Sequence, residues 1–158
     1  SSDSGVTRYR VNTEEWMMYD RKKPSYWAFE KGVYMEQFDS IFNVEASIKA
    51  DTAYYYDKER LWKLIGNVDI QNRKGERFNT ELLYWNEATQ KVYSDKFIRI
   101  QQPDRIITGH GFDSNQQMTI YTIRNIEGIF YVDEEASSGP PQPETKALPD
   151  SVNKDTAK

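Results

Sequence analysis

The stretch Leu64–Trp85, LIGNVDIQNRKGERFNTELLYW, decides the fold class of this chain. Starting just before it, apolar and polar side chains alternate, and one face collects every second residue: Trp62, Leu64, Gly66, Val68 and Ile70. A period of two is typical of a β-strand with one buried face. Residues Asn72 to Gly75 then mark a hairpin turn before the next apolar run. We therefore expect two antiparallel strands, with the even-numbered residues of the first strand on the inner face.

The rest of the body favours strands as well. β-Branched and aromatic residues stand in short runs bounded by Gly, Asn, Asp and Lys, as in strands and their turns. The segment KVYSDKFIRI, residues 91–100, would as a helix group Val92, Phe97 and Ile100. The residues Gln102-Pro103-Asp104 after it, and its lack of Ala and Leu, favour a strand instead. The expected fold class is all-β.

An internal repeat of about 29 residues organises these strands. A shift of 29 places Tyr55 over Tyr84 and Gly66 over Asp95, and a third copy, TGHGFDSNQQMTIYTI, begins at Thr108. This length fits one hairpin, two strands with two short connections, per repeat. Since one hairpin cannot bury its apolar face alone, we expect stacked hairpins in an elongated antiparallel meander folded over its own inner face.

Composition excludes several classes of function. The 158 residues contain no Cys and one His, which excludes disulfides, thiol catalysis and Cys/His zinc sites. The net charge of −4 lacks the basic excess of nucleic-acid-binding proteins. No apolar run approaches the roughly 20 residues of a membrane helix, and the first residues do not show the charged, apolar and small-residue pattern of a leader peptide. The chain does not begin with Met, so we expect any membrane anchor to lie upstream of Ser1.

The chain divides near Asp133. All 22 aromatic residues precede this position, whereas residues 133–158 hold four of the six prolines. Such a tail cannot bury enough apolar surface to offset the entropy of ordering it. We predict one β domain at residues 1–132 and a disordered, acidic, Pro-rich tail at residues 133–158.

Few side chains suggest chemistry. His110, in TGHGFDSN, has no second His and is interpreted as a turn or surface residue. Gly109 and Gly111 resemble a dinucleotide fingerprint, but the third glycine is missing and another strand follows. With Gly66 they are better explained as structural glycines, at bulges or close backbone approaches. We expect that the protein is not an enzyme and that it binds neither a metal nor a cofactor.

Two surface features leave alternatives open. Arg73, Lys74 and Arg77 in NRKGER could meet an anionic headgroup, although a solvated hairpin tip explains them more simply. The aromatic runs AYYYD and LYWNE could stack on sugar rings, although core and rim packing explains them as well. Asp51, Asp57 and Asp95 recur near turns and read as caps.

Several short motifs, taken in order, resemble one family. They are Lys49-Ala-Asp-x-Ala53, Leu64-x-Gly-Asn-Val68, Thr80 followed by Tyr84, Val92-x-Ser-Asp95 and Thr108-Gly-x-Gly-Phe112. This series is similar to the periplasmic domain of the LptC family of lipopolysaccharide export, and more broadly to the OstA-like repeat proteins. The resemblance spans roughly residues 29–131 and leaves the tail outside.

The resemblance implies a twisted, open β jelly roll that holds the acyl chains of lipid A between its sheets. It implies a periplasmic location, a tether to the inner membrane, receipt of lipopolysaccharide from an inner-membrane ABC transporter, and passage to an LptA-like bridge protein. It places lipid-contacting positions near Phe29 and around Gln117 and Met118, and a family glycine at Gly109. The unpaired edges of an open sheet would suit strand addition by such a bridge protein.

We therefore predict a non-enzymatic module for lipopolysaccharide binding and transfer. The alternatives are a structural or scaffolding repeat protein whose interior is an ordinary core, and a carbohydrate-binding module. The predicted lipid-binding residues share the apolar inner face: Phe29, Val33, Ile48, Ala50, Ala53, Trp62, Leu64, Val68, Ile70, Phe78, Leu83, Ile98, Ile100, Ile107, Phe112, Met118 and Ile120.

Overall fold

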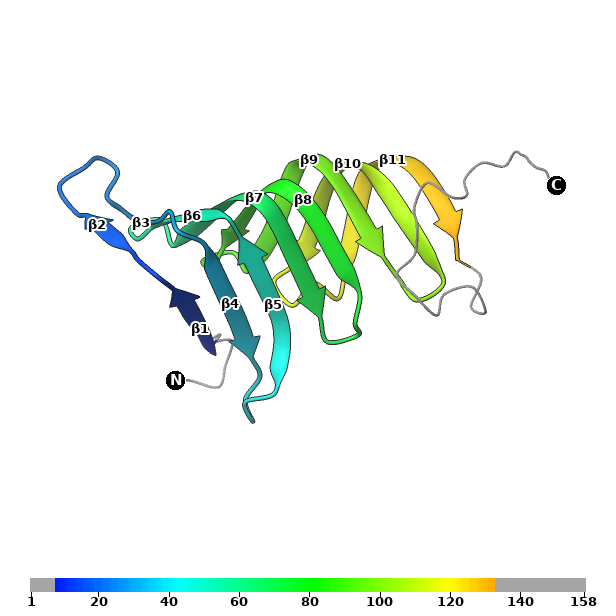
Figure 1. Ribbon diagram of the computed structural model, residues 1–158, viewed down its shortest axis with the longest axis horizontal. Coiled ribbons are helices and arrows are strands. Elements are labelled where there is room, and N and C mark those ends of the chain that lie inside the picture. Colours follow the sequence, from blue (N-terminus) through cyan, green and yellow to red (C-terminus); the bar gives the residue numbers. More distant parts are fainter. Residues whose placement is uncertain (1–7, 133–158) are drawn as a thin grey trace.

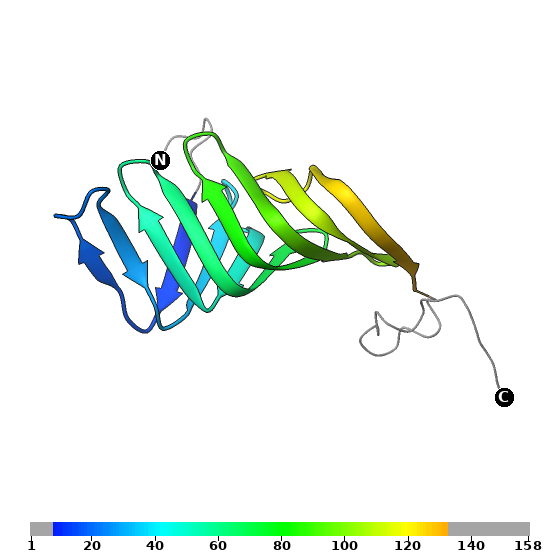
Figure 2. The ribbon, with the colours of Figure 1, turned by 90° about the horizontal axis from the view of Figure 1, so that it is seen from above.

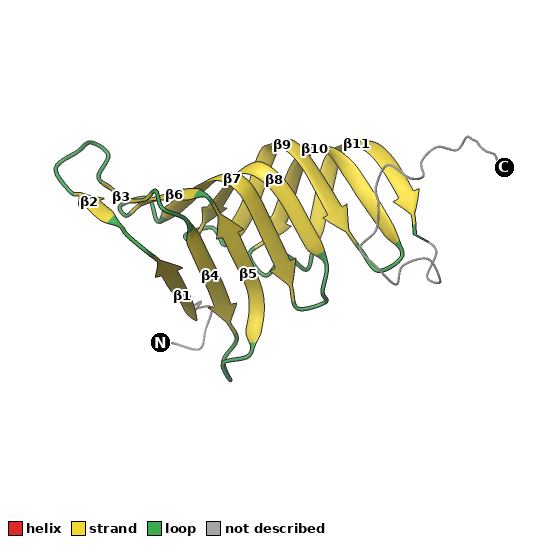
Figure 3. Cartoon of the chain, viewed as in Figure 1, coloured by secondary structure: helices red, strands yellow, loops and turns green. Residues whose placement is uncertain are grey.

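The computed structural model describes residues 8–132, and all regular structure in this range is β (Figures 1 and 3). No helix of these residues is therefore available to cross a membrane. The predicted tail lies outside the described residues. The eleven strands are β1 (Arg8–Thr13), β2 (Met17–Tyr19), β3 (Tyr26–Phe29), β4 (Val33–Phe38), β5 (Val44–Ala50), β6 (Thr52–Tyr56), β7 (Leu61–Asn72), β8 (Arg77–Asn86), β9 (Lys91–Gln101), β10 (Arg105–Asn115) and β11 (Tyr121–Tyr131).

The strands form one antiparallel sheet that does not close. Its order is β1-β4-β5-β7-β8-β9-β10-β11, while β2 pairs with β3, β3 with β6, and β6 with β7. The edges are therefore β1 and β2 at one end of the elongated molecule and β11 at the other (Figures 1 and 2). The predicted all-β, open and antiparallel fold is confirmed.

The sheet folds over itself because each long strand passes through two layers, and the short strands pair with one layer or the other. β7 pairs with β6 through residues 61–65 and with β5 through residues 69–72, so β5 and β6 are two arms of one bent strand. β4 and β3 continue the same arrangement, as do β1 and β2. We call the layer that contains β1, β4 and β5 layer A, and the layer that contains β2, β3 and β6 layer B.

A line of bulges, which we call the crease, marks where β7 to β11 pass between the layers. The β7–β8 register shifts between Ile65 and Val68, where both Gly66 and Asn67 have positive φ. In β9 the extra residues fall around Asp95, 29 positions after Gly66, which accounts for the repeat. Bulges increase local twist and bend the strand that carries them.

The predicted structural glycines all lie at or beside the crease. Gly66 and Gly111 both have a φ of 87°, a conformation that side chains rarely adopt. Gly109 stands at the β10–β11 register shift, where a Cβ would collide with the carbonyl oxygen of Asn125. Gly66 and Gly111 thus lie at bulges in the backbone, and Gly109 lies at a close backbone approach.

The hairpin that defines the inner face forms as expected. The Gly75 amide donates to the Asn72 carbonyl at 3.0 Å, which closes the turn between β7 and β8. Trp62, Leu64, Val68 and Ile70 are each no more than 1% exposed. Alternation in this strand therefore did identify the inner face.

One predicted inner-face residue is misplaced. Ile120 is 75% exposed, in the connection before β11 rather than within a strand. The Asn115 side-chain oxygen accepts hydrogen bonds from the amides of Thr119 and Ile120 at 2.9 and 3.1 Å. This cap holds the connection in a turn, so the alternation of MTIYTI does not continue through it.

Candidate functional site

The apolar interior between layers A and B is the main candidate site. Apart from Ile107 and Ile120, every predicted inner-face residue belongs to its single core cluster. Ile107 is buried outside that cluster, at 9% exposure. Leu64, Phe78, Ile98 and Phe112 have no exposed surface at all, so this part of the interior is filled by side chains.

The interior is open at the β1/β2 end. A cavity of about 340 Å³ lies there between the two layers, and we call it the mouth. β1 contributes one wall, β3 contributes the other and Trp62 of β7 forms the inner limit. The lining residues are Tyr9, Val11, Thr13, Trp16, Trp27, Phe29 and Trp62.

Aromatic rings shape the mouth. Trp16 lies 5.5 Å from Trp27 and 6.1 Å from Phe29 between ring centroids, and Phe29 lies 5.4 Å from Trp62. Trp16 itself is 48% exposed. Because Phe29 and Trp62 also belong to the core cluster, the lining of the mouth is continuous with the filled interior.

One carboxylate reaches the aromatic core beside the mouth. Glu87 accepts hydrogen bonds from the Tyr55 hydroxyl at 2.9 Å and from the Trp62 indole nitrogen at 3.3 Å. Burial, followed by the neighbouring Glu87 carboxylate, raises the pKa of Tyr9 well above its ordinary value. The same two causes raise the pKa of Tyr55. Both phenols therefore stay neutral at physiological pH, as suits groups beside an apolar cavity.

The connection between β10 and β11, residues 116–120, covers the interior beside β4, β7 and β8. We call it the latch. The Asn72 side-chain nitrogen donates to the Met118 carbonyl at 2.8 Å, and the Gln37 side-chain nitrogen donates to the Gln116 carbonyl at 3.0 Å. These bonds join layer A to the latch, and the Met118 side chain points inward with 1% exposure. Sequence reasoning did not find this closure.

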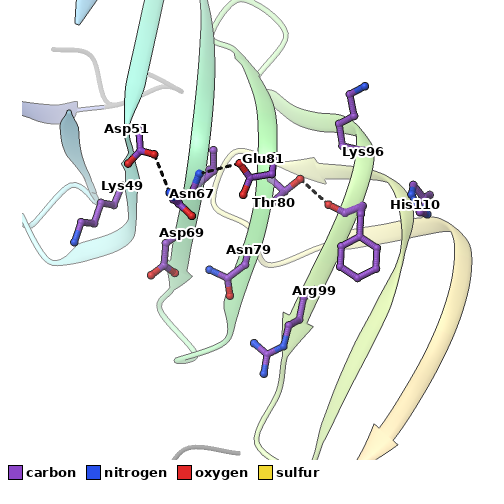
Figure 4. Close-up of a pocket in the computed structure, with 12 residues that line it drawn as sticks. Lys49, Asp51, Asn67, Asp69, Asn79, Thr80, Glu81, Lys96, Arg99 and His110 are labelled. Atoms are coloured by element: carbon purple, nitrogen blue, oxygen red, sulfur yellow. Dashed lines mark hydrogen bonds between the residues drawn. The ribbon is translucent and has the colours of Figure 1, made fainter. Parts of the chain in front are cut away.

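A second hollow, of about 810 Å³, lies on the outer face of the sheet across β5 and β7 to β10 (Figure 4). Its walls carry both charges, with Lys49, Lys96 and Arg99 near Asp69 and Glu81. Asn67 donates from its side chain to Asp51 at 2.8 Å and from its backbone to Glu81 at 3.3 Å, as Figure 4 shows. Such a polar, mixed lining does not suit an acyl chain.

His110 lies in the middle of β10, so its interpretation as a turn residue is wrong. The surface interpretation is confirmed, because its side chain is 49% exposed and forms a pair with Glu127 of β11. The register shift between His110 and Phe112 marks the crease within a continuous strand. Among residues 8–132, no group of His and carboxylate side chains is arranged to hold a metal ion.

The basic hairpin tip is a solvated turn, as predicted. Arg73 lies 3.9 Å from Glu45 and Arg77 lies 3.1 Å from Asp69, nitrogen to oxygen. Asn72 organises the turn by accepting hydrogen bonds from the Lys74 and Glu76 amides. Two of the three cations are thus already beside carboxylates.

The aromatic runs divide between the two faces. Tyr55 and Trp85 are buried in the core at 8% and 1% exposure, so they are not a sugar platform. Tyr54 and Tyr56 alternate with Tyr55 and point to the outer face, where they line a different hollow.

The sequence pattern of a known family fits this architecture. The model of the family described as LptC, lipopolysaccharide-assembly, LptC-related, matches residues 4–131. The chain belongs to this LptC-related family. No curated protein sequence matches the chain.

A solved structure shares the fold of this LptC-related chain. It is LptH, the LptA homologous periplasmic component of the conserved lipopolysaccharide transport device from Pseudomonas aeruginosa. The TM-score is 0.58 at 11% identity, covering 80% of this chain and 94% of that chain. At such low identity the likeness shows the fold alone, which is the open β jelly roll that was predicted.

Membership gives the coarse role of the LptC-related chain. The family is described as one of lipopolysaccharide assembly, and this is the coarse role that membership gives. The mouth was missed in the sequence because its walls include β1 and Trp16, in the segment TRYRVNTEEWMMYD. A local signal was present there: three exposed large apolar residues in a row, Trp16, Met17 and Met18.

Proposed function

We propose that this chain binds lipopolysaccharide by its acyl chains and passes it along the apolar interior. The mouth is the observation that supports this proposal, since it is an apolar opening whose walls continue into the core cluster. Each methylene moved from water into such a site contributes about 0.8 kcal/mol. Several acyl chains on one molecule would therefore supply a large driving force.

Loading requires the interior to rearrange. Phe78, Leu83 and Phe112 fill the space between the layers, so an acyl chain beyond the mouth must displace them. We infer that the chain enters at the mouth and advances as core side chains repack and the latch is released. The energy would come from an inner-membrane ABC transporter that delivers the lipid.

Partners would join the interior at its ends. β1 and β2 offer unpaired backbone groups at the mouth, and β11 does so at the other end. Strand addition there would extend both layers, so we propose docking of an LptA-like bridge protein with the same fold. The domain would work in the periplasm, tethered to the inner membrane by an anchor upstream of Ser1.

Site-specific photocrosslinking to lipopolysaccharide tests the inner-face assignment. Crosslinkers at Phe29, Leu64 and Met118 should capture lipid, with Phe29 at the mouth reacting first. Labels at Lys63 and Asn67, on the opposite face of β7, should not. Equal capture by both sets would refute the assignment of the groove.

The filled interior also favours a second candidate, a scaffold whose inner face is only a core. Leu64, Val68, Ile70 and Ile98 show 0% exposure, as expected of ordinary packing. Native mass spectrometry after incubation with lipopolysaccharide separates the two. Bound lipid supports transport, whereas a lipid-free chain that still pairs with its partner by an edge supports the scaffold.

A further inference from the structure

A cluster of tyrosines covers the outer face of layer B beside the mouth. Tyr19 of β2 and Tyr26 of β3 are paired in register, and their rings stack with centroids 4.9 Å apart. Tyr54 and Tyr56 of β6 approach the Tyr26 ring at 5.9 and 5.8 Å. We call these four residues, with Lys22 and Lys23, the tyrosine patch.

The patch encloses usable space. A hollow of about 440 Å³ is lined by all four tyrosines, by both lysines and by Pro24 and Glu30. This volume lies within the range of about 300–1,000 Å³ that is usual for small-molecule sites. The tyrosines are half-buried, so their rings are held in place and still reach solvent.

Local bonds fix the walls of the hollow. The Ser25 hydroxyl donates to Asp57 at 2.8 Å, which ties the end of the β2–β3 connection to the β6–β7 turn. The Tyr54 hydroxyl donates to Glu30 at 3.0 Å, which orients the ring and occupies that carboxylate. Within residues 8–132, Lys22 and Lys23 form no ion pair, so their ammonium groups are available for an anion.

We propose that the tyrosine patch binds an anionic saccharide, with sugar rings against the tyrosines and phosphate or carboxylate groups at Lys22 and Lys23. The face of an aromatic ring carries negative charge and attracts the weakly positive C–H groups of a sugar face. Lysine donates charge-assisted hydrogen bonds to phosphate and carboxylate oxygens. An acyl chain fits the patch less well, because it would leave phenols and ammonium groups without partners.

The position of the patch connects it with the mouth. Trp27 of β3 lines the mouth, whereas the adjacent Tyr26 lines the patch, because successive residues of a strand point to opposite faces. The patch reaches the free edge of layer B, because Tyr19 lies on β2, the edge strand of that layer. This inference rests on the proposed function in one respect: a lipopolysaccharide that straddles this edge would place acyl chains inside and its phosphorylated saccharide on the patch.

The test uses lipopolysaccharide from which the acyl chains have been removed, titrated into the purified chain by calorimetry or by NMR. This probe has no lipid, so it reports the patch independently of the groove. We expect binding that weakens about tenfold in Tyr26→Ala and in the double variant Lys22→Glu/Lys23→Glu. Tyr26→Phe, which keeps the ring, should bind like the wild type. Removing the phosphate and carboxylate groups from the probe should abolish the effect of the lysine variant.

The matched control is Tyr84→Ala. Tyr84 also stacks on a tyrosine, Tyr93, at 5.4 Å, but on strands β8 and β9 away from the patch. Its binding should equal that of the wild type. Absence of binding at millimolar probe, or equal losses in Tyr84→Ala and Tyr26→Ala, would overturn the proposal.

Since Lys22 and Lys23 are exposed, their variant keeps the test valid if Tyr26→Ala unfolds. An acyl probe that still binds while the saccharide does not would leave the transport function standing.

Discussion

Replacing Asn72 by Ala should reveal how strongly the latch holds the two layers together. The Asn72 side chain, only 6% exposed, donates to the Met118 carbonyl and to Glu76, both at 2.8 Å. Its oxygen accepts from the Lys74 amide at 3.0 Å and from the Glu76 amide at 2.9 Å. One residue therefore caps the β7–β8 turn and binds the latch.

The expected loss has two parts. Leaving the buried Met118 carbonyl without its donor costs about 1–3 kcal/mol. Losing a side-chain cap on backbone amides costs about 1 kcal/mol more, by analogy with helix caps. We expect the free energy of unfolding to fall by roughly 2–4 kcal/mol, a large fraction of the about 5–15 kcal/mol of an ordinary domain.

Urea unfolding followed by tryptophan fluorescence measures this loss, with Asn86→Ala as the matched control. Asn86 caps the β8–β9 turn by accepting from the Thr89 amide at 3.1 Å, and within residues 8–132 its side chain has no hydrogen bond to the opposite layer. Its loss should be about 0.5–1 kcal/mol. Equal losses in the two variants would refute the reasoning, because the bond to Met118 would then add nothing.

Three other changes have definite expectations. Gly109→Ala should destabilise the domain by about 2 kcal/mol or more in urea unfolding, because its Cβ meets the Asn125 carbonyl; a loss within error of wild type would contradict the close approach. Leu64→Ala should cost about 2–5 kcal/mol by the same measurement, whereas Ile65→Ala on the opposite face should cost less. The raised Tyr9 pKa means that the folded chain holds this phenol proton more tightly than the unfolded chain. That stabilisation is present below about pH 10, the ordinary tyrosine value, and is lost as the pH rises above it. Wild type should therefore lose more stability than Tyr9→Phe between about pH 9 and about pH 11, and parallel losses would exclude Tyr9 as the cause.

Alternation predicted the inner face wherever a strand ran without interruption. Val68 and Ile70 follow the rule on the far side of the crease. After the bulge at Gly66 and Asn67, the even-numbered residues of β7 again point to the inner face. The rule failed at Ile120, where the Asn115 cap outweighs the preference of MTIYTI for strand. The alternation of apolar and polar residues does not predict local hydrogen bonds of this kind.

The mouth and the latch depend on contacts distant in the sequence. Gln37 and Gln116 are 79 residues apart, and no sequence pattern around either residue predicts the hydrogen bond between them. The tyrosine patch could be predicted in part from the sequence, because the run AYYYD was interpreted as a possible platform for sugar rings. That Tyr54 and Tyr56 face outward while Tyr55 faces inward depends on the pairing of β6 with β3, and no sequence motif predicted that pairing.

The crease has a consequence for how cargo can be accommodated. Each of β7 to β11 runs through both layers, so hydrogen bonds between neighbouring strands follow the sheet around the bend and do not span the interior. The layers can thus move apart by changing the bend at the bulges while the backbone ladder stays intact. Hydrogen exchange should then remain slow for strand amides during loading, and the work of loading would fall on side-chain packing and on the two bonds that join layer A to the latch.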